Sequence, residues 1–233
     1  MAQYESVYQG AAVSDLGVAS RAQFLSRTYA HLTGAVFAFT FLEIALFKSG
    51  LAEKIALALT GVSWLVVLGG FMVVSWLASR TAAAAASKGA QYLALSGFVV
   101  AEAIIFVPLL YLANAVAPGV IASAAVVTFV GFSGLTAVVF VTRKDFSFLR
   151  GILFWGFIVA LVLIVASVLF GWNLGTWFSV GMIALAGAAI LHDTSNVLLH
   201  YPQDRYISAA LQLFASVALM FWYVLRLFLR LRN

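Results

Sequence analysis

The stretch Phe148–Phe170 reads FLRGILFWGFIVALVLIVASVLF, and from Gly151 onward it contains no charged residue. The hydrocarbon core of a bilayer is about 30 Å thick, and a helix needs about 20 consecutive apolar residues to cross it. A helix over this stretch is therefore long and apolar enough to span a membrane.

The composition of the whole chain points the same way. Of its 233 residues, 64% are hydrophobic and 9% are charged, whereas soluble domains are roughly 25% charged. The mean hydropathy is +1.08, and apolar runs occur along the whole length. This composition excludes a water-soluble globular protein and indicates a multi-pass integral membrane protein.

Seven apolar runs, bounded by charges, glycine or proline, are long enough to cross a bilayer. They lie at Thr28–Phe47, Lys54–Ala78, Ala90–Ala113, Gly119–Val141, Phe148–Phe170, Thr176–Leu199 and Tyr206–Leu229. The connections between them are short and leave no room for a separate soluble domain. We predict an all-α fold, a polytopic bundle of seven transmembrane helices that forms a single domain over residues 28–233, after a polar N-terminal tail over residues 1–27.

The basic residues are distributed unevenly between the two sides that seven spans define. One side carries Arg21, Arg27, Arg80, Lys88, Arg143, Lys144, Arg150 and Arg205, and the other carries Lys48, Lys54, Arg226, Arg230 and Arg232. The positive-inside rule therefore predicts a cytoplasmic N-terminus. The three arginines at the C-terminal end conflict with the rule and leave open a six-span alternative, in which the last segment dips into the membrane and returns.

Several classes of function are excluded or disfavoured. The net charge of +5 does not indicate a nucleic-acid partner, because the basic residues stand singly in short connections and form no stripe. The absence of cysteine excludes disulfides, thiolate metal sites and thiol catalysis. The sequence contains no His-Glu-x-x-His metal motif and no glycine-rich phosphate loop, so we expect no cofactor.

Ionisable side chains inside the spans are candidates for function, because a charge at the bilayer centre costs at least ~2.5–3.5 kcal/mol. Glu102 lies near the middle of the third span, where a carboxylate beside Pro108 suits a cation path or a proton relay. The alternative is a protonated glutamate that is hydrogen-bonded to a neighbouring helix. Glu43 lies toward the outer end of the first span, and we expect it to be solvated.

Asp193, in the inner half of the sixth span, is the strongest candidate. The protonation of a carboxylate in apolar surroundings depends on its neighbours, so Asp193 is predicted to act as a proton sensor. It shares a helix face with Asn196 and His200, at i, i+3 and i+7. The alternative is a polar helix end that is hydrated at the membrane interface.

The last span carries Ser208, Gln212 and Ser216 at successive i+4 positions, a stripe that must face protein or water. These residues either line a hydrated path beside Asp193 or only hydrogen-bond across helices. Arg80, at the cytoplasmic end of the second span, lies at the depth of Asp193. It either closes the path through a salt bridge to Asp193 or only sets the topology.

A specific block of motifs occupies the last two spans: Ile190-Leu-His-Asp193-Thr-Ser, Tyr201-Pro-Gln-Asp-Arg-Tyr206, Ala209-Ala-Leu-Gln-Leu-Phe-Ala-Ser216 and Tyr223-Val-Leu-Arg226. Together with Arg27-Thr-Tyr29, Ala101-Glu102 and the stretch Pro118–Lys144, this block resembles the Bax inhibitor-1 family, also called transmembrane Bax inhibitor motif proteins, including its bacterial members. The resemblance covers nearly the whole chain from Arg21. It implies a seven-helix bundle with the last helix central, located in the bacterial inner membrane and acting as a pH-sensitive calcium leak.

In that family, two aspartates on the last two spans share a proton and bind an arginine of the second span, so that protonation switches the path. Asp193 matches the first aspartate, and Arg80 is matched to the arginine as a latch. Ser216 stands where the second aspartate is expected. A serine cannot share a titrating proton or supply charge to a calcium ion. His192 is a candidate substitute, because imidazole titrates near neutral pH.

The resemblance and the polar pattern together define the predicted site. The proton-sensing and gating residues are Asp193, Arg80, His192 and Ser216, and the ion path consists of Glu102, Gln212 and Asn196. The expected partners are the lipid bilayer and calcium or other cations. One aspartate among neutral oxygens makes a poor calcium site, so calcium binding is expected to be weak.

Two other functions stay open. A non-conducting regulator that binds other membrane proteins, such as a protease, is favoured by the missing aspartate. The segment Gly131-Phe-Ser133-Gly134, together with His192, resembles rhomboid intramembrane serine proteases and gives a remote alternative. Ser133 falls mid-helix rather than at a helix N-terminus, so it is more simply a packing contact, and we expect the protein not to be an enzyme.

Overall fold

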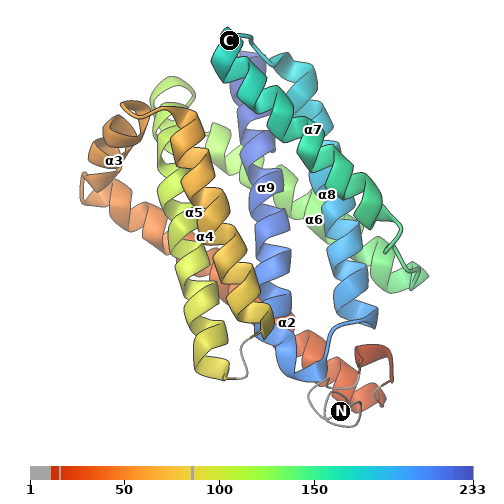
Figure 1. Ribbon diagram of the computed structural model, residues 1–233. Helices are drawn as coiled ribbons and strands as arrows, with labels where there is room; N and C mark the ends of the chain where they lie inside the picture. The colour runs from red at the N-terminus through yellow and green to blue at the C-terminus, as the bar shows by residue number, and fades with distance from the viewer. Residues whose placement is uncertain (1–11, 16, 85–86, 233) are drawn as a thin grey trace.

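The computed structural model of the protein describes residues 12–15, 17–84 and 87–232, and this part of the chain is helical. Its elements are η1 (Val13–Asp15), α2 (Val18–Lys48), α3 (Leu51–Thr60), α4 (Trp64–Ala84), α5 (Lys88–Val116), α6 (Val120–Thr142), α7 (Leu149–Phe170), α8 (Gly175–Leu199), η2 (Gln203–Arg205) and α9 (Tyr206–Arg232). The predicted all-α bundle is confirmed (Figure 1).

Among the described elements, seven helices are long and apolar enough to cross a membrane: α2 and α4 to α9. The start of α2 and the end of α9 lie at opposite ends of the bundle (Figure 1). α9 runs without a break from Tyr206 to Arg232. The seven-span prediction is therefore confirmed, and the six-span alternative, with a last segment that dips and returns, is wrong.

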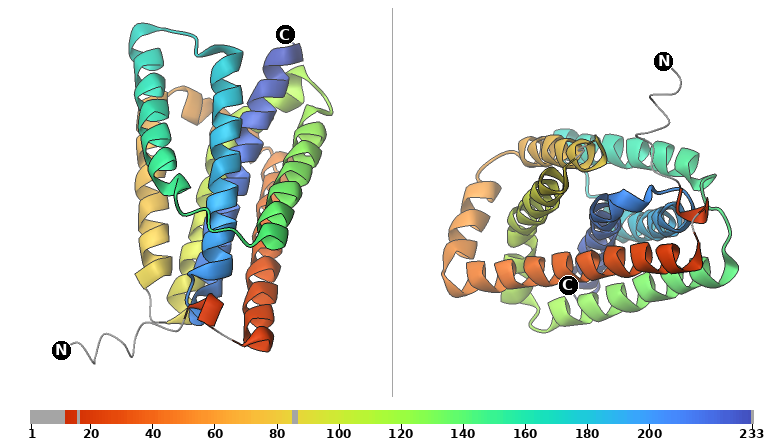
Figure 2. Two further views of the ribbon diagram at one scale, coloured as in Figure 1. Left: turned by 90° about the vertical axis from the view of Figure 1, so that its right-hand side faces the viewer. Right: turned by 90° about the horizontal axis from the view of Figure 1, so that it is seen from below.

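α9 occupies the centre of the bundle (Figure 2). Of the described spans it is the most buried, with 67% of its apolar window inside the protein, against 56% for α5 and 28% or less for the others. α2, α4, α5, α6 and α8 pack around it, whereas α7 packs on α8 and α4. Ala209 and Ala210, both 0% exposed, allow neighbouring helices to approach closely. The central last helix is thus confirmed.

The second predicted span, Lys54–Ala78, is wrong in its boundaries, because two helices occupy this region. α3 ends at Thr60, whose hydroxyl donates a hydrogen bond to the Ala56 carbonyl at 2.8 Å, and Gly61 follows directly. Both features weaken the continuation of a helix. The spanning helix is α4 alone, and α3 packs against α5 at one end of the bundle.

The first span is longer than the sequence predicts. α2 begins at Val18 rather than at Thr28, and its first turns carry polar residues that hydropathy does not identify as spanning. The predicted tail over residues 1–27 is therefore shorter, and residues 1–11 and 16 of it lie outside the described residues. α2 crosses the bundle obliquely and lies on the same side of α9 as α6 (Figure 2).

Candidate functional site

The candidate site lies where α8 meets α9, near the turn that joins them. This turn contains Pro202 and η2, and it returns the chain directly alongside α8. A short connection of this kind places the last turns of one helix beside the first turns of the next. Asp193 of α8 therefore lies beside Gln212 and Ser216 of α9.

The Asp193 carboxylate is buried, with 7% of the residue exposed. Its Oδ2 accepts a hydrogen bond from Ser216 Oγ at 2.5 Å, and its Oδ1 accepts one from Gln212 Nε2 at 2.6 Å. His192 Nδ1 lies 3.0 Å from the same Oδ1. The structure thus brings together four residues that the sequence singled out, while their roles in sensing and conduction stay predictions.

The carboxylate ties two helices together through its acceptor oxygens. An ionised carboxylate only accepts hydrogen bonds, and donors on α9 occupy both oxygens of Asp193. Protonation of either oxygen turns an acceptor into a donor, so one of these contacts has to be remade. The carboxylate of Asp193 is therefore part of the contact between α8 and α9.

Tyr201 belongs to the same hydrogen-bonded group, and sequence reasoning missed it. Its hydroxyl donates to Gln212 Oε1 at 2.5 Å, which leaves the amide nitrogen of Gln212 directed at Asp193. Burial raises the pKa of Tyr201 to about 12, so the phenol remains a protonated donor at physiological pH. The available signal was its position before Pro202, in the turn between two spans.

Ala12 and Val13, before α2, are paired through their backbone with the turn that contains Tyr201. The Val13 N–H donates to the Tyr201 carbonyl at 2.9 Å, and Ala12 pairs with Pro202 in an isolated antiparallel bridge. Arg21, near the start of α2, donates to the Val13 carbonyl at 3.2 Å. The first span is therefore connected to the Asp193 group through η1 and the turn.

Asp193 lies on the wall of a cavity of about 840 Å³ between α4, α7, α8 and α9. His192, Tyr201, Gln212 and Ser216 line this cavity with it. Arg150, in the first turn of α7, lines the cavity too and gives its wall a permanent positive charge. Sequence reasoning treated Arg150 only as a topology-setting residue, because nothing in the sequence shows which way α7 faces.

Arg80 does not face Asp193, so the predicted salt bridge between them is not formed. The Arg80 side chain is exposed, and its guanidinium lies over the Trp76 ring at 5.0 Å from the centroid. Ser79 and Ala83 of α4 line the cavity instead. Successive residues of a helix are turned by about 100°, which directs Arg80 away from the cavity that Ser79 faces. A latch role for Arg80 stays a prediction.

Asn196 contributes to the site through its backbone. Its carbonyl accepts hydrogen bonds from the N–H groups of His200 at 2.8 Å and Tyr201 at 3.1 Å, where α8 ends. Its side chain is not part of the lining of the Asp193 cavity, so its placement does not favour the predicted ion-path role. His200 also turns away from Asp193, since its Nε2 lies 3.4 Å from Asp145 Oδ2 in the α6–α7 connection.

Asp145 is a second carboxylate at this end of the bundle, but it lies outside the cavity. It accepts hydrogen bonds from the Ser147 hydroxyl at 2.5 Å and from the Ser147 N–H at 2.8 Å. These bonds hold the pKa of Asp145 below its ordinary value. Ser195 of α8 accepts a hydrogen bond from the neighbouring Phe146 N–H at 2.9 Å, which fixes the connection against α8.

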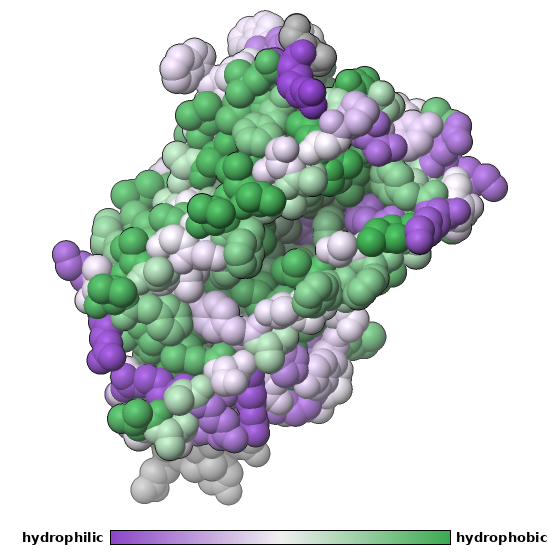
Figure 3. Space-filling model, turned by 180° about the vertical axis from the view of Figure 1, so that it is seen from behind, coloured by the Kyte–Doolittle hydropathy of each residue, from purple (hydrophilic) through white to green (hydrophobic). Residues whose placement is uncertain are grey.

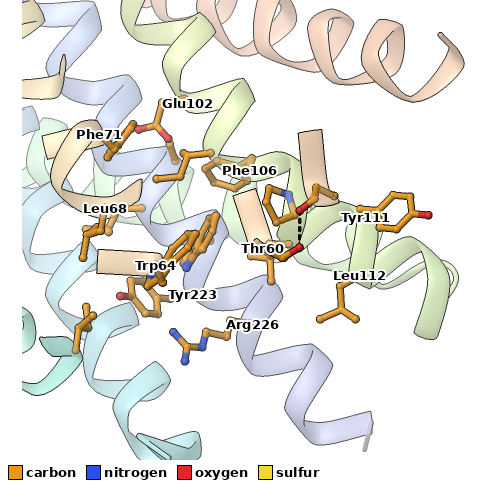
Figure 4. A pocket seen from close by; sticks show the side chains of 18 of the residues that line it. Thr60, Trp64, Leu68, Phe71, Glu102, Phe106, Tyr111, Leu112, Tyr223 and Arg226 are labelled. Carbon is orange, nitrogen blue, oxygen red and sulfur yellow. Dashed lines mark hydrogen bonds between the residues drawn. The ribbon is translucent and has the colours of Figure 1, made fainter. Parts of the chain in front are cut away.

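Glu102 lies at a second cavity, of about 870 Å³, rather than beside Asp193. The residue is 6% exposed, and its side chain lies beside Phe71, well apart from Arg226 of the same lining (Figure 4). This cavity is bordered by α3, α4, α5, α7 and α9. The Asp193 and Glu102 cavities have three lining residues in common: Ser79, Ala215 and Leu219.

The described residues do not form a cluster of acidic and histidine side chains for a metal. Over residues 12–15, 17–84 and 87–232, no three His, Asp or Glu side chains lie close enough to hold an ion. Calcium prefers about six to eight oxygen ligands. The Asp193 group itself supplies one carboxylate and the neutral oxygens of Gln212 and Ser216.

Ser133 lies in the middle of α6 and is exposed. No helix begins at this position, so the backbone N–H groups that would form an oxyanion site are used within the helix. The ring of His192 approaches Asp193, and no hydrogen bond joins it to Ser133 in the described part of the chain. The arrangement does not assemble the nucleophile and base of a rhomboid protease.

Comparison with known proteins gives relatives in bacteria. An uncharacterized protein of Pseudomonas aeruginosa is 37% identical over 110 residues, which are 47% of this chain and 49% of the relative. An uncharacterized membrane protein of Vibrio cholerae is 33% identical over 106 residues, 45% and 47% of the two chains. The modulator of FtsH protease YccA of Escherichia coli is 37% identical over 83 residues, 35% and 37% of the two chains. The matches span about half of these relatives or less.

The match to one protein family extends over nearly the whole chain. The family described as "Inhibitor of apoptosis-promoting Bax1" matches residues 21–233, from the first turn of α2 to the end of the chain. The matched region contains all seven spans, the central last helix and the Asp193 group. The protein is therefore a multi-pass integral membrane protein of the Bax inhibitor-1 family.

Proposed function

We propose that the protein is a pH-sensitive cation leak of the Bax inhibitor-1 type, controlled around Asp193. The observation that carries this proposal is the relation of two cavities along α9. The Asp193 cavity and the Glu102 cavity follow one another, and their common wall contains Ser79, Ala215 and Leu219. A small displacement of α9 against α4 would join them into one path.

The charges along this path suit slow passage of cations. Asp193 and Glu102 each place a carboxylate on the wall of one cavity, which favours cations over anions. Arg150 lines the first cavity, and Arg226 lines the second. These fixed positive charges oppose rapid passage, as expected of a leak.

Protonation of Asp193 would act on the contact between α8 and α9. In the ionised state, Gln212 and Ser216 both donate to the carboxylate. A hydrogen bond to a charged group contributes about 1.5–3 kcal/mol. Loss of one such bond is enough to shift a two-state equilibrium between closed and open arrangements by about tenfold or more.

Ser216 at the second-aspartate position makes this switch simpler than the family pattern. Asp193 lies beside His192 and has no second carboxylate here with which to share a proton. With one carboxylate and neutral oxygens, calcium would bind weakly and discrimination among cations would be low. With the N-terminus in the cytoplasm of a bacterium, the Asp193 cavity would lie toward the cytoplasmic face of the inner membrane.

Flux measurements in liposomes test the proposal. The purified protein is reconstituted, and the release of calcium or potassium is followed between about pH 6 and 8. The wild type is expected to leak with a pH-dependent rate, and Asp193→Asn is expected to lose that dependence. Asp145→Asn, the same change at a carboxylate outside the cavity, is the control and should keep the wild-type profile. An unaltered pH profile in Asp193→Asn contradicts the proposal.

Modulation of a membrane-bound protease is the second candidate function. It is favoured by the relative from Escherichia coli, which is named as a modulator of FtsH protease. In this function, the Asp193 group would set the packing of α8 and α9 for a protein partner without conduction. Absence of flux at every pH, together with co-purification of the chain with a membrane-bound protease whose turnover rate it changes, would favour this candidate over the leak.

A further inference from the structure

Glu43, on α2, is a buried carboxylate without a hydrogen-bond partner. Only 7% of the residue is exposed, and neither Oε1 nor Oε2 is hydrogen-bonded within the part of the chain that the structure describes. The expectation of a solvated side chain near the outer surface is therefore wrong. Helices that are distant in the sequence, α5, α6 and α9, enclose the space that Glu43 faces.

That space is a third cavity, of about 880 Å³, with an almost entirely apolar lining. α2 and α6 both pack on α9 and meet each other at the rings of Tyr29 and Phe140, 5.8 Å apart. Elsewhere between these two helices, the lining residues Phe37 and Phe129 are 57% and 70% exposed. The face of the molecule opposite to that in Figure 1 is largely apolar and hollowed (Figure 3). A ligand that enters between α2 and α6 therefore comes from the bilayer.

The polar groups of this cavity indicate the chemistry of its ligand. A buried carboxylate without a donor is costly, so a donor of positive charge would stabilise this site. Thr128 Oγ1, on α6, lines the same cavity and is also buried without a partner among the described residues. Lys48, exposed at the end of α2, lines the cavity too, and the ion pairs of the described residues do not include it. The cavity thus holds an unsatisfied acceptor inside and a basic side chain at its edge, and a ligand with a positive donor and a negative group would match both.

We propose that this cavity binds a membrane glycerophospholipid whose headgroup ends in a primary ammonium. The ammonium donates to Glu43 and Thr128, the phosphate pairs with Lys48, and the acyl chains lie beside Phe37 and Phe129 in the opening between α2 and α6. Glu43 and Lys48 are separated by five residues, about 7.5 Å along the helix axis. Their side chains and a zwitterionic headgroup can bridge this separation.

Other occupants fit the cavity less well. A quaternary ammonium has no N–H to donate to the two carboxylate oxygens. A divalent cation needs more charged ligands than the described part of the chain gathers here, and it leaves the apolar lining unexplained. Protonation of Glu43 would remove its charge but would still leave both of its oxygens without a hydrogen-bond partner in the arrangement of the described residues. A lipid with a primary ammonium both donates hydrogen bonds to the Glu43 carboxylate and covers the apolar wall with its acyl chains.

Native mass spectrometry of the full chain tests this site. The protein is delipidated and exchanged into nanodiscs that contain equal amounts of phosphatidylethanolamine, its N-methylated and N,N-dimethylated forms, phosphatidylcholine and phosphatidylglycerol, all with the same acyl chains. We expect retained lipid to be enriched in phosphatidylethanolamine and to decrease with each added methyl group. Glu43→Gln should reduce the ratio of retained phosphatidylethanolamine to phosphatidylcholine by about tenfold, as expected for the loss of one charge-assisted contact.

Matched variants separate this site from general lipid contact. Glu53→Gln removes an exposed carboxylate on α3, outside the cavity, and should retain the wild-type preference. Lys48→Gln should lower the retention of every phosphate-containing lipid at the site, whereas Lys54→Gln should not. Equal retention of the five lipids by the wild type overturns the proposal, even if Glu43→Gln does not fold. An unchanged preference in folded Glu43→Gln overturns it as well.

Discussion

Asp193 and Glu43 are both buried carboxylates, but their neighbours give them different chemistry. Asp193 receives hydrogen bonds from Gln212 and Ser216, whereas Glu43 has no partner within the described residues. A buried polar group whose partners are all in place stabilises one arrangement of the helices. A buried polar group that lacks them favours a ligand that supplies them. Asp193 is therefore held by its own helix neighbours, whereas Glu43 offers its oxygens to the cavity that it lines.

Tyr201→Phe removes the donor to Gln212 Oε1 and keeps the ring. We expect the free energy of unfolding to fall by about 1–2 kcal/mol, measured by denaturant titration in detergent. The folded pKa of about 12 lies above the ordinary 10.0, so the contribution of the phenol is complete below about pH 10 and is lost as pH rises through about 12. The difference in free energy of unfolding between the wild type and Tyr201→Phe should therefore decrease in strong alkali. Tyr111→Phe is the control, and an equal effect of both variants contradicts this role.

Ser216→Asp places a second carboxylate against Asp193. At acid pH the pair can share a proton, whereas at higher pH both groups ionise and repel each other. The variant is therefore expected to be most stable at acid pH and to lose thermal stability as pH rises from about 5 to 8. Ser216→Ala, which only removes the donor to Asp193 Oδ2, should be destabilised without this trend. Parallel melting profiles for the two variants would show that position 216 is not coupled to Asp193.

At the scale of the helices, Gly156 of α7 packs against the side chain of Leu185 of α8. A Cβ atom added at Gly156 would lie 2.6 Å from Leu185 Cδ1, closer than non-bonded carbon atoms pack. α7 and α8 line the Asp193 cavity with other residues than these two. The packing at Gly156 therefore bears on the stability of the α7–α8 contact.

Gly156→Val is expected to lower the free energy of unfolding by about 1–3 kcal/mol, because the added side chain overfills this contact. Gly151→Val, on the same helix, is the matched control, since a Cβ there meets no atom within 4 Å. The second change Leu185→Ala should restore part of the loss by making room. Thermal unfolding in detergent measures all three variants. If the two glycine variants are equally stable, close packing at Gly156 is not what limits the approach of α7 to α8.

At the scale of the whole molecule, seven spans place successive connections on alternate sides of the membrane. The α6–α7 connection and the α7–α8 connection therefore lie on opposite sides. The chain has no cysteine, so a single introduced thiol reports the side of its own position. Lys144 and Trp172 are both exposed in these connections, so a cysteine at either position can be labelled without disturbing the core.

In intact spheroplasts, a membrane-impermeant maleimide is expected to react with one of the two variants Lys144→Cys and Trp172→Cys and not with the other. The excess of basic residues on the side of Lys144 predicts that this thiol is cytoplasmic and is protected in intact spheroplasts, whereas the thiol at position 172 reacts. Both should react after permeabilisation, which controls for access. Equal protection of the two thiols would contradict the seven-span arrangement, and reversed protection would contradict the predicted orientation alone.

The number of spans and the place of Gln212 and Ser216 beside Asp193 are predictable from the sequence, for physical reasons. Bilayer thickness fixes the length of an apolar run, and helical periodicity places Gln212 and Ser216 on one face of α9. The break after Thr60 was not predictable from hydropathy, since both α3 and α4 are apolar. The local features at this break are the Thr60 hydroxyl bond and Gly61, and neither changes the hydropathy of the run.

The features that the sequence did not predict depend on how helices rotate and pack. Arg80 and Arg150 both lie near one end of the bundle, but only Arg150 lines the Asp193 cavity. The rotation of α4 and α7 about their axes decides this, and single-sequence patterns of nearly uniform apolarity do not encode it. The burial of Glu43 likewise depends on α6 and α9, and the part played by Tyr201 depends on the turn closed by Val13.

The measurement that tests the control by Asp193 most directly follows its protonation and the cation flux in the same reconstituted sample. Infrared difference spectroscopy, wild type minus Asp193→Asn, reports the protonated carboxyl group of this residue as pH is varied between about 6 and 8. We predict that the carboxyl signal and the flux rate change with the same midpoint. A flux that changes with pH while the carboxyl signal of Asp193 stays constant would contradict control by this residue.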